Sequence, residues 1–402
     1  IIGIEQLSTI LYNHYGDFMK KIKLFVCLVL LLVGCQPQPQ TQPQKEETKN
    51  TVSCHFIGDL LYEKPYYDWI EDDSQDKGYY DLVKTYFQKD DLTIANLETP
   101  IGGKELNISG TGYSFNASRE IGKQVASLDL EVVSTANNHA NDRGNQGIDN
   151  TLDFLKEKDI LAVGTYYNQD DRDQGKYMTI HGIKLGFVSY TYATNQIVSD
   201  ENQAKVALFN RPSDRKMTQA YKDLLTKEVT QTRENCDVLI AMMHWGNEFT
   251  YDISTQQEEV SQLLSDLGVD IIIGNHSHCS QPMEWINNNR TLCMYSLGNF
   301  VSADPIVDRT HQEFKNAYNV SMMVSLDIVK ENNQISIQNI DYIPVINYYD
   351  EHLQNFKLIP YDQYTSQYET SHYHYHNGLT KEWIQQTYQK LIPEKLSNHQ
   401  LQ

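Results

Sequence analysis

Two histidines stand one residue apart in the segment IIIGNHSHCSQPMEW, residues 271–285. His276 and His278 follow a short apolar run, at the point where a buried strand would end. Such a pair either solvates a loop or binds a metal ion, because neutral imidazole is a common metal ligand. His244 ends another apolar run, DVLIAMMHW, and Glu248 follows it four residues later. These residues predict a metal site if further ligands converge on them.

Metal-capable side chains also follow other predicted strands. From residue 51 onward, short apolar runs alternate with helical patterns, which predicts an α/β fold with largely parallel strands. In open α/β sheets, ligands bind beyond the carboxyl ends of the strands. Five predicted strands end in groups that can bind a metal or transfer a proton: Asp59; Asn96 and Glu98; Asn137, Asn138, His139 and Asp142; His244 and Glu248; His276 and His278.

Each of these groups alone has an ordinary structural explanation. Asp59 could belong to a turn, Glu98 to a helix cap, and His244 could be a packed histidine. Together they supply carboxylate, amide and imidazole ligands, which is the set that Mn, Fe and Zn use in proteins. The sequence therefore predicts one shared site for divalent metal.

Antiparallel strands are expected in the second half of the chain. Residues 282–297 predict a hairpin around three asparagines. Residues 317–329 and 334–345 alternate with period two, as half-buried strands do. We therefore expect the main domain to span residues 51–345. Residues 346–402 are rich in Tyr, Gln and His, and we expect them to form a peripheral, partly helical tail.

The expected tail contains the tract SHYHYHNG. On a strand, His372, His374 and His376 would share one face and could bind metal. The alternative is a solvated segment with adventitious affinity for metal.

Six motifs resemble those of a known protein family. GDL, NLETP, ANNHANDRG, HWGNE, GNHSHCSQPME and YSLGNF occur in this order between residues 52 and 302. They are similar to the motifs of CapA-type poly-gamma-glutamate capsule biosynthesis proteins, which belong to the calcineurin-like metallophosphoesterase superfamily. The resemblance implies a layered α/β/β/α sandwich with a dinuclear metal centre in catalytic members. Asn299, in YSLGNF, is either a residue of this site or a turn residue that caps a strand.

The resemblance also implies roles for individual residues. Asp59 resembles the metal carboxylate of the first strand. Glu98 takes the region of the carboxylate that bridges two metals, with Asn96 as a rival or helper. Asn138 resembles the amide ligand, and His139 resembles the catalytic histidine that faces the leaving group. The imidazole ligands implied by the resemblance are His244, His276 and His278.

The chain departs from the superfamily pattern in its first motif. The usual motif is Asp-x-His, but Asp59 is followed by Leu60 and Leu61, so one metal position loses an imidazole. We expect one or two divalent ions, Mn, Fe or Zn, and the missing imidazole favours a harder ion such as Mn or Mg. Asp142 and Glu248 either orient imidazoles or are exposed charges near a turn.

The predicted centre supports metal-dependent hydrolysis. The superfamily implies a phosphoester substrate, whereas the family name implies an amide-linked glutamate polymer. The alternative function is a non-catalytic surface lipoprotein that tethers or helps export an envelope polymer, or positions a membrane biosynthetic complex. Leu61 favours this alternative, and the otherwise intact set of imidazoles disfavours it.

The N-terminal region carries a predicted export signal. Residues 19–34 combine lysines with an apolar run that is too short for a typical membrane span. The letters LVGC resemble a bacterial lipobox, which implies lipidation of Cys35; an ordinary signal peptide or a membrane anchor is the alternative. Residues 35–50 form a Pro/Gln-rich tether, and residues 1–18 precede the expected natural start. We therefore expect a protein bound to the bacterial membrane through Cys35, at its extracytoplasmic face.

Composition narrows the choice of partners. The formal net charge is −20 in 402 residues. Such a surface repels nucleic acid, because phosphate contacts require Lys and Arg. Cys54, Cys236, Cys279 and Cys293 are widely spaced and form no disulfide framework. We expect no nucleic-acid partner and assign no disulfide pairs.

Overall fold

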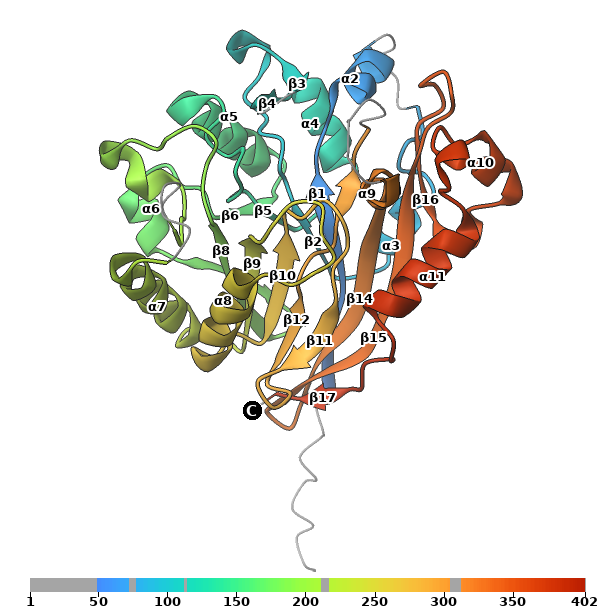
Figure 1. Ribbon diagram of the computed structural model, residues 1–402. Coiled ribbons are helices and arrows are strands. Elements are labelled where there is room, and N and C mark those ends of the chain that lie inside the picture. Colours follow the sequence, from blue (N-terminus) through green and yellow to red (C-terminus); the bar gives the residue numbers. More distant parts are fainter. Residues whose placement is uncertain (1–48, 72–76, 112–113, 211–216, 304–311, 402) are drawn as a thin grey trace, which may run out of the picture. The chain divides into compact units, whose positions relative to one another are not determined.

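The computed structural model describes residues 49–71, 77–111, 114–210, 217–303 and 312–401. The expected signal peptide, Cys35 and nearly all of the tether lie outside the described residues. Within these ranges the chain forms two large sheets flanked by helices (Figure 1). None of the helices in this part has the length and apolar content to span a bilayer.

The first large sheet has nine strands and a parallel part that extends to one edge. That part has the order β1 (Lys49–Leu60), β2 (Leu92–Asn96), β5 (Val132–Ser134) and β6 (Leu161–Val163). On the other side of β1 lies an antiparallel meander of β14 (Val320–Glu331), β15 (Gln334–Tyr348) and β16 (Lys357–Pro360). Two short strands complete the sheet, β13 (Asn299–Val301) beside β1 and β17 (His399–Gln400) beside β15.

The second large sheet has six strands. Its parallel part consists of β8 (Ile183–Thr191), β9 (Val238–His244), β10 (Ile271–Asn275) and β12 (Thr291–Met294). Its edges are antiparallel, with β7 (Lys176–Ile180) on β8 and β11 (Met283–Ile286) on β12. The hairpin predicted in residues 282–297 is thereby confirmed. A separate small sheet pairs β3 (Ser109–Thr111) with β4 (Ser114–Asn116).

Three apolar layers show how the sheets and helices stack. Between the two sheets, Phe56 and Ile94 of the first share a core with Ile240 of the second. On the outer face of the first sheet pack α4 (Arg119–Ala126) and α5 (Gly144–Glu157). On the outer face of the second pack α7 (Gln219–Arg233) and α8 (Thr255–Asp266). The expected α/β/β/α sandwich is confirmed.

The described residues form six further helices. They are α2 (Lys64–Glu71), α3 (Lys84–Phe87), α6 (Gln169–Asp173), α9 (Gln312–Ala317), α10 (Ser366–Ser371) and α11 (Lys381–Leu391). The same part of the chain contains four 3-10 turns, η1 (Lys104–Leu106), η2 (Asp200–Lys205), η3 (Tyr361–Gln363) and η4 (Tyr375–Asn377). The four cysteines of the described ranges are free thiols.

The C-terminal residues lie differently from the peripheral tail that we expected. β15 continues through residue 345, and β16 adds a strand to the first sheet. Tyr364, Leu379 and Ile384 are fully buried in the core between the sheets. The tail interpretation is corrected because tyrosines supply much of the buried surface here, and they make a weak aliphatic pattern in the sequence.

The histidine tract is part of this packing. His372 and His374 are buried, and only His376 of the three is exposed. The Nε2 atom of His372 lies 2.9 Å from the carbonyl oxygen of Asn347. The Nε2 atom of His374 lies 3.0 Å from the hydroxyl of Tyr349. These bonds account for the two buried imidazoles as structural groups.

Glu131, which precedes β5, provides a test of the fold at some distance from the predicted site. Burial raises the pKa of Glu131 to about 7, and the negative charge of Asp90 adds to this rise. The hydrogen bond that Glu131 accepts from the Thr93 N–H lowers the pKa but only partly offsets it. A carboxyl whose pKa is higher in the folded protein stays protonated there to a higher pH than in the unfolded chain. Its contribution to stability is therefore fully present below about pH 4.5 and is lost as the pH rises through about 7.

We expect Glu131→Gln to raise the free energy of unfolding by about 1–2 kcal/mol at pH 8, a range reduced from the full pKa shift because the side chain is only partly buried. At pH 4 we expect almost no change, because both states then carry a neutral side chain. Urea unfolding at the two pH values measures the difference, with exposed Glu234→Gln as the matched control. An equal effect at both pH values would contradict the account.

Candidate metal centre

The two sheets bring their carboxyl ends together at one place. In the first sheet, Asp59 on β1 pairs with Asn96 on β2 and Asn299 on β13. In the second, His244 on β9 pairs with Asn275 on β10. The backbone N–H of His276 donates to the Asp59 carboxylate across 3.3 Å, which joins the sheets at this point. The predicted ligands from both sheets therefore share one site.

Asp59, Glu98 and His244 form the first of two metal-capable groups. One ligand atom from each lies within 4.8 Å of the others, and all three side chains are buried. The Asn138 side-chain oxygen lies 2.8 Å from Nε2 of His244, so the amide joins the same group. The side-chain amide of Asn96 donates to Asp59 across 2.7 Å. In this arrangement Asn96 supports Asp59 and directs its N–H group, not its oxygen, to the carboxylate.

Burial opposes charge on both carboxylates of this group. It raises the pKa of Asp59 to about 7, although the hydrogen bond from Asn96 acts to lower that pKa. It raises the pKa of Glu98 well above its ordinary value, and the negative charge of Asp59 raises it further. Within the described residues, no N–H or O–H group donates to either oxygen of Glu98. Its ion-pair contacts there are with His244 at 3.7 Å and His139 at 4.0 Å.

Burial also keeps the imidazoles neutral. It lowers the pKa of His244 and of His276 well below the ordinary value, and the neighbouring histidines lower both further. Neutral imidazole and ionised carboxylate are the forms that bind a metal ion. A divalent cation would also offset the cost of burying two carboxylates side by side. The residues therefore fit a metal centre.

Glu248, His276 and His278 form the second metal-capable group. Their ligand atoms also lie within 4.8 Å of one another. The rings of His276 and His244 lie 4.7 Å apart between centroids, so the two groups are neighbours. Nδ1 of His278 lies 3.0 Å from the side-chain oxygen of Asn299. Asn299 thus begins β13 and also orients an imidazole of the site.

His139 lies beside the first group. Its Nδ1 atom is 2.7 Å from the carboxylate of Asp142, and its Nε2 atom is 4.0 Å from Glu98. The same Asp142 oxygen accepts the backbone N–H of Phe115 across 2.6 Å. The ring of Phe115 meets the His139 ring edge-on at 4.5 Å. Asp142 therefore fixes the orientation of the imidazole and directs Nε2 toward the centre.

Three neighbouring residues were not predicted from the sequence. Phe115 comes from β4, and Tyr192 and Asn195 come from the loop after β8. The Tyr192 ring lies 4.7 Å from that of His276. The backbone N–H of Asn195 donates to the carbonyl of Asn138 across 2.7 Å. The segment KLGFVSYTY, residues 184–192, predicts a strand, so Tyr192 and Asn195 could have been found from their position at its end. No such signal marks Phe115.

Two glycines allow the strands to approach so closely at the site. A Cβ atom on Gly58 would lie 1.8 Å from the carbonyl oxygen of Gly298, and one on Gly274 would lie 2.0 Å from that of Tyr295. Both contacts are with backbone, which cannot move aside as a flexible side chain would. Gly58 and Gly274 precede Asp59 and Asn275, so the close packing sets the positions of the strand ends.

We expect Gly58→Ala to lower the free energy of unfolding by about 3 kcal/mol or more, because overpacking against backbone forces β1 and β13 apart. Gly144→Ala is the matched control, since a Cβ atom there meets nothing within 4 Å. Its cost should be the conformational one of a positive φ, about 1 kcal/mol. Urea denaturation measures both, and equal costs would refute the role of the close contact.

A family model described as "Bacterial capsule synthesis protein PGA_cap" matches residues 53–304. The chain belongs to this family. The matched range contains every residue of the two metal-capable groups, together with His139, Asp142 and Asn299. The meander of β14, β15 and β16 lies beyond it. The family assignment therefore covers the site but not the C-terminal strands that complete the first sheet.

Relatives of this chain carry names from the same field. The PGA biosynthesis protein CapA of Bacillus subtilis (strain 168) is 25% identical over 267 residues, which are 65% of this chain and 66% of that protein. The capsule biosynthesis protein CapA of Bacillus anthracis is 25% identical over 305 residues, 71% of each chain. The match with the first relative thus spans just under two thirds of its length.

Solved structures with a similar chain course include a protein from Mycoplasma pneumoniae described as a novel phosphatase, with a TM-score of 0.45 and 13% identity. That alignment covers 74% of this chain and 95% of the other. A hypothetical protein from Thermus thermophilus has a TM-score of 0.44 and 14% identity, covering 73% of this chain and 98% of the other.

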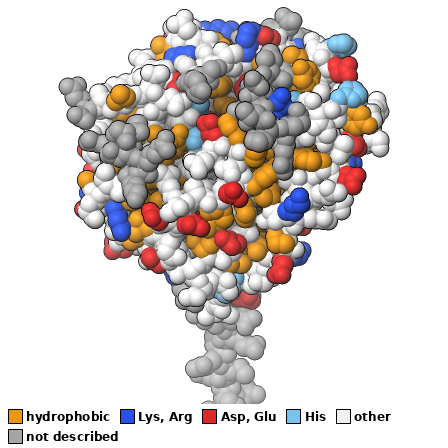
Figure 2. All heavy atoms as spheres, in the orientation of Figure 1, with side chains coloured by type: hydrophobic (Ala, Val, Ile, Leu, Met, Phe, Trp, Pro, Cys, Tyr) orange, Lys and Arg blue, Asp and Glu red, His pale blue; other side chains and the backbone are white. Residues whose placement is uncertain are grey.

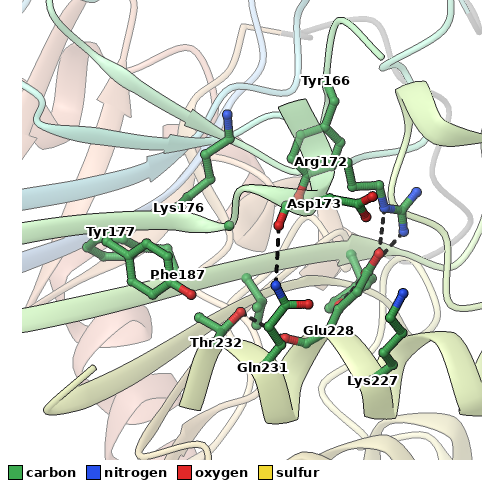
Figure 3. A pocket seen from close by; sticks show the side chains of 13 residues that line it. Tyr166, Arg172, Asp173, Lys176, Tyr177, Phe187, Lys227, Glu228, Gln231 and Thr232 are labelled. Atoms are coloured by element: carbon green, nitrogen blue, oxygen red, sulfur yellow. Dashed lines mark hydrogen bonds and ion pairs between the residues drawn. The ribbon is translucent and has the colours of Figure 1, made fainter. Parts of the chain in front are cut away.

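The pocket drawn in Figure 3 lies apart from this site, where α6, β8 and α7 meet. Arg172 and Glu228 point toward one another there, with Nε and Oε1 separated by 2.7 Å (Figure 3). The Tyr190 hydroxyl donates to the same carboxylate across 2.8 Å. Because Arg172 and Glu228 neutralise each other, we assign this pocket a packing role.

Proposed function

We propose that this chain acts in the synthesis of a capsule or envelope polymer, poly-gamma-glutamate being the first choice, as a metal-dependent hydrolase. The names of the Bacillus relatives and the family assignment support the biosynthetic role. The convergence of two neighbouring metal-capable groups at one place, the first of which includes the buried carboxylate of Glu98, supports the hydrolytic one. This convergence is the observation that carries the proposal.

The protein side of the centre divides into ligands and a proton-transfer group. Asp59, Glu98, Asn138 and His244 would hold one ion, and His276 and His278 would contribute to a second. Divalent ions at such sites supply hydroxide near neutral pH and stabilise negative charge on a phosphoryl or carbonyl oxygen. Mn, Fe and Zn all suit this set of oxygen and nitrogen donors.

His139 is the proposed catalytic residue. Asp142 holds Nδ1, so Nε2 faces the centre and can transfer a proton to the leaving group. The walls beside His139 and His276 are aromatic, formed by Phe115 and Tyr192. Such walls limit the access of water to the reacting atoms and strengthen the electrostatic interactions there.

The proposed location is the outer face of the bacterial membrane, with the lipid on Cys35 as the anchor. This part of the proposal rests on the lipobox-like sequence alone. We propose no nucleic-acid partner, because the net charge is −20. The face drawn in Figure 2 has acidic and apolar side chains interspersed across its middle, without a broad basic groove there. A membrane biosynthetic complex is a further proposed partner.

The test is hydrolysis by the purified protein with and without added Mn, Fe or Zn. One substrate is a chromogenic phosphodiester, and the other is poly-gamma-glutamate, whose chain length is followed by size-exclusion chromatography. Metal-dependent turnover of either substrate supports the hydrolase and identifies its bond class. Loss of turnover in His139→Gln would tie the reaction to this site.

A non-catalytic role as a surface tether is the second candidate. Leu61 favours it, because a hydrocarbon side chain stands where the superfamily pattern has an imidazole. Under this alternative the protein would bind the polymer without shortening it, and the metal-loaded protein would turn over neither substrate.

A further inference from the structure

Leu61 stands where the superfamily pattern has an imidazole, so the resemblance implies that one metal position lacks a ligand there. The side chain is 2% exposed and packs with Phe115 and Tyr318, and Phe249 lies against the same small cluster. The place of the missing imidazole is therefore filled by hydrocarbon that cannot bind a metal ion. Any side-chain ligand that replaces it must come from another segment of the chain.

Among the described residues, the carboxylate of Glu248 lies close enough. Its Oε1 atom is 4.0 Å from Nε2 of His278, and its side chain is 40% exposed. One oxygen of Glu248 and one nitrogen each of His276 and His278 lie within 4.8 Å of one another. Three donors at these separations can bind one ion after small side-chain movements, since metal–ligand bonds to oxygen and nitrogen are about 2.0–2.2 Å.

The loop that carries Glu248 is fixed to the loop that carries the histidines. The backbone N–H of Phe249 donates to the carbonyl of Ser277 across 2.8 Å. The side-chain amide of Gln281 donates to the carbonyls of Thr250 and Asp252, both across 3.0 Å. These bonds hold the two loops in register, so the backbone that carries Glu248 is fixed beside the loop that carries the imidazoles.

Aromatic packing and backbone conformation reinforce this attachment. The ring of Phe249 stacks on that of His278, with centroids 5.5 Å apart and planes inclined by 22°. Phe249 has a φ of 57°, and His276 has a φ of 96°. Positive φ is unfavourable for such residues and is retained where surrounding contacts enforce it. Both loops therefore adopt strained turns that bring the three side chains together.

The imidazoles present nitrogen atoms to this position. His276 is 3% exposed, and its Nδ1 atom has no hydrogen-bond partner among the described residues. Nδ1 of His278 is engaged by Asn299, and Nε2 faces Glu248 across 4.0 Å. A buried ring nitrogen without a partner is costly, and a metal ion would remove that cost.

The geometry points to Glu248 as a metal ligand that takes the place of the imidazole lost at Leu61. The inference rests on the proposed metal centre and makes its two positions unequal. The Asp59–Glu98–His244 position is fully enclosed, whereas the Glu248–His276–His278 position opens to solvent on the side of the glutamate. A carboxylate in place of an imidazole also shifts the preference of this outer position toward harder ions such as Mn or Mg.

The test compares Mn²⁺ binding to the metal-stripped full-length protein and to Glu248→Gln. Titration calorimetry gives stoichiometry and affinity, and electron paramagnetic resonance distinguishes a coupled ion pair from single ions. We expect the wild-type protein to bind two equivalents and Glu248→Gln to keep one, with the other affinity reduced more than about 100-fold. A residue that only orients a ligand typically changes affinity by about 10–100-fold. Glu259→Gln, an exposed acid on α8, is the matched control and should bind as the wild type does.

Each outcome separates this inference from the proposed function. Two equivalents bound with unchanged affinity by Glu248→Gln would overturn the role of Glu248 and leave the metal centre standing. A single equivalent in both proteins would do the same. No binding to the wild-type protein would overturn the proposed function itself, and the role of Glu248 with it.

Discussion

Replacing His276 with asparagine is expected to weaken metal binding by at least about 100-fold while the fold survives. Loss of a direct ligand should exceed the roughly 10–100-fold effect of a residue that only orients one. Asparagine is the suitable replacement because His276 has a φ of 96°, and asparagine tolerates positive φ better than alanine. Removing a buried imidazole should not unfold the metal-free protein, since the ring nitrogen Nδ1 makes no hydrogen bond within the described residues.

Metal content after dialysis, by plasma mass spectrometry, measures this effect, and circular dichroism checks the fold. His376→Asn is the matched control, because His376 is an exposed histidine of the C-terminal segment. If His276→Asn held as much metal as the wild type, at the same affinity, His276 would not be a ligand.

A second large effect is expected at His139. His139→Gln should lower turnover of a phosphodiester or glutamyl substrate by about 10²–10⁴-fold, the range typical for loss of general acid–base catalysis. Its metal content should stay unchanged, because Nδ1 is engaged by Asp142 and Nε2 lies 4.0 Å from the nearest Glu98 oxygen. This separation of turnover from metal content distinguishes a catalytic histidine from a ligand.

Asp142→Asn tests the orientation of that histidine. An asparagine can present its N–H group to the imidazole where the aspartate accepts a hydrogen bond, so the ring would turn or change tautomer. We therefore expect Asp142→Asn to lower turnover as His139→Gln does. Asp153→Asn, on the exposed side of α5, is the control and should leave turnover unchanged. Activity of His139→Gln within about twofold of the wild type would argue against the catalytic role.

The sequence predicted the site best where chemistry and strand ends coincide. Asp59, Glu98, Asn138, His244 and His276 each follow a short buried run, and parallel strands carry such positions to the same edge. The alternation of apolar runs with helical patterns therefore located the residues that the fold brings together. The antiparallel partner of β12 was equally visible, because asparagines mark the turn before it.

Other contacts depend on tertiary packing that no local pattern reports. Glu248 was ambiguous in the sequence, because a charged residue after a strand is usually a solvated one. Its place beside His278 follows from hydrogen bonds between two loops, such as that from Phe249 to Ser277. Asn299 begins strand β13 and also lies within hydrogen-bond distance of the imidazole of His278. The sequence presented these two roles only as alternatives.

The C-terminal segment shows a different limit. Tyr364, Tyr388 and Leu379 complete the core between the sheets, but their spacing matches neither the helical nor the strand period over a useful length. Aromatic residues with polar tips also occur on surfaces, so composition alone indicated a peripheral tail. The sequence alone did not show that β16 pairs with β15, the strand that brings the C-terminal segment onto the first sheet.

The metal content of the protein, purified without an affinity tag, decides whether the two metal-capable groups bind ions. We expect about two equivalents of Mn, Fe or Zn per chain, one for each group. No bound metal, even after reloading with Mn and Zn, would contradict it. The buried carboxylate of Glu98 would then need another partner, and the protein would have to be understood as a tether for its polymer.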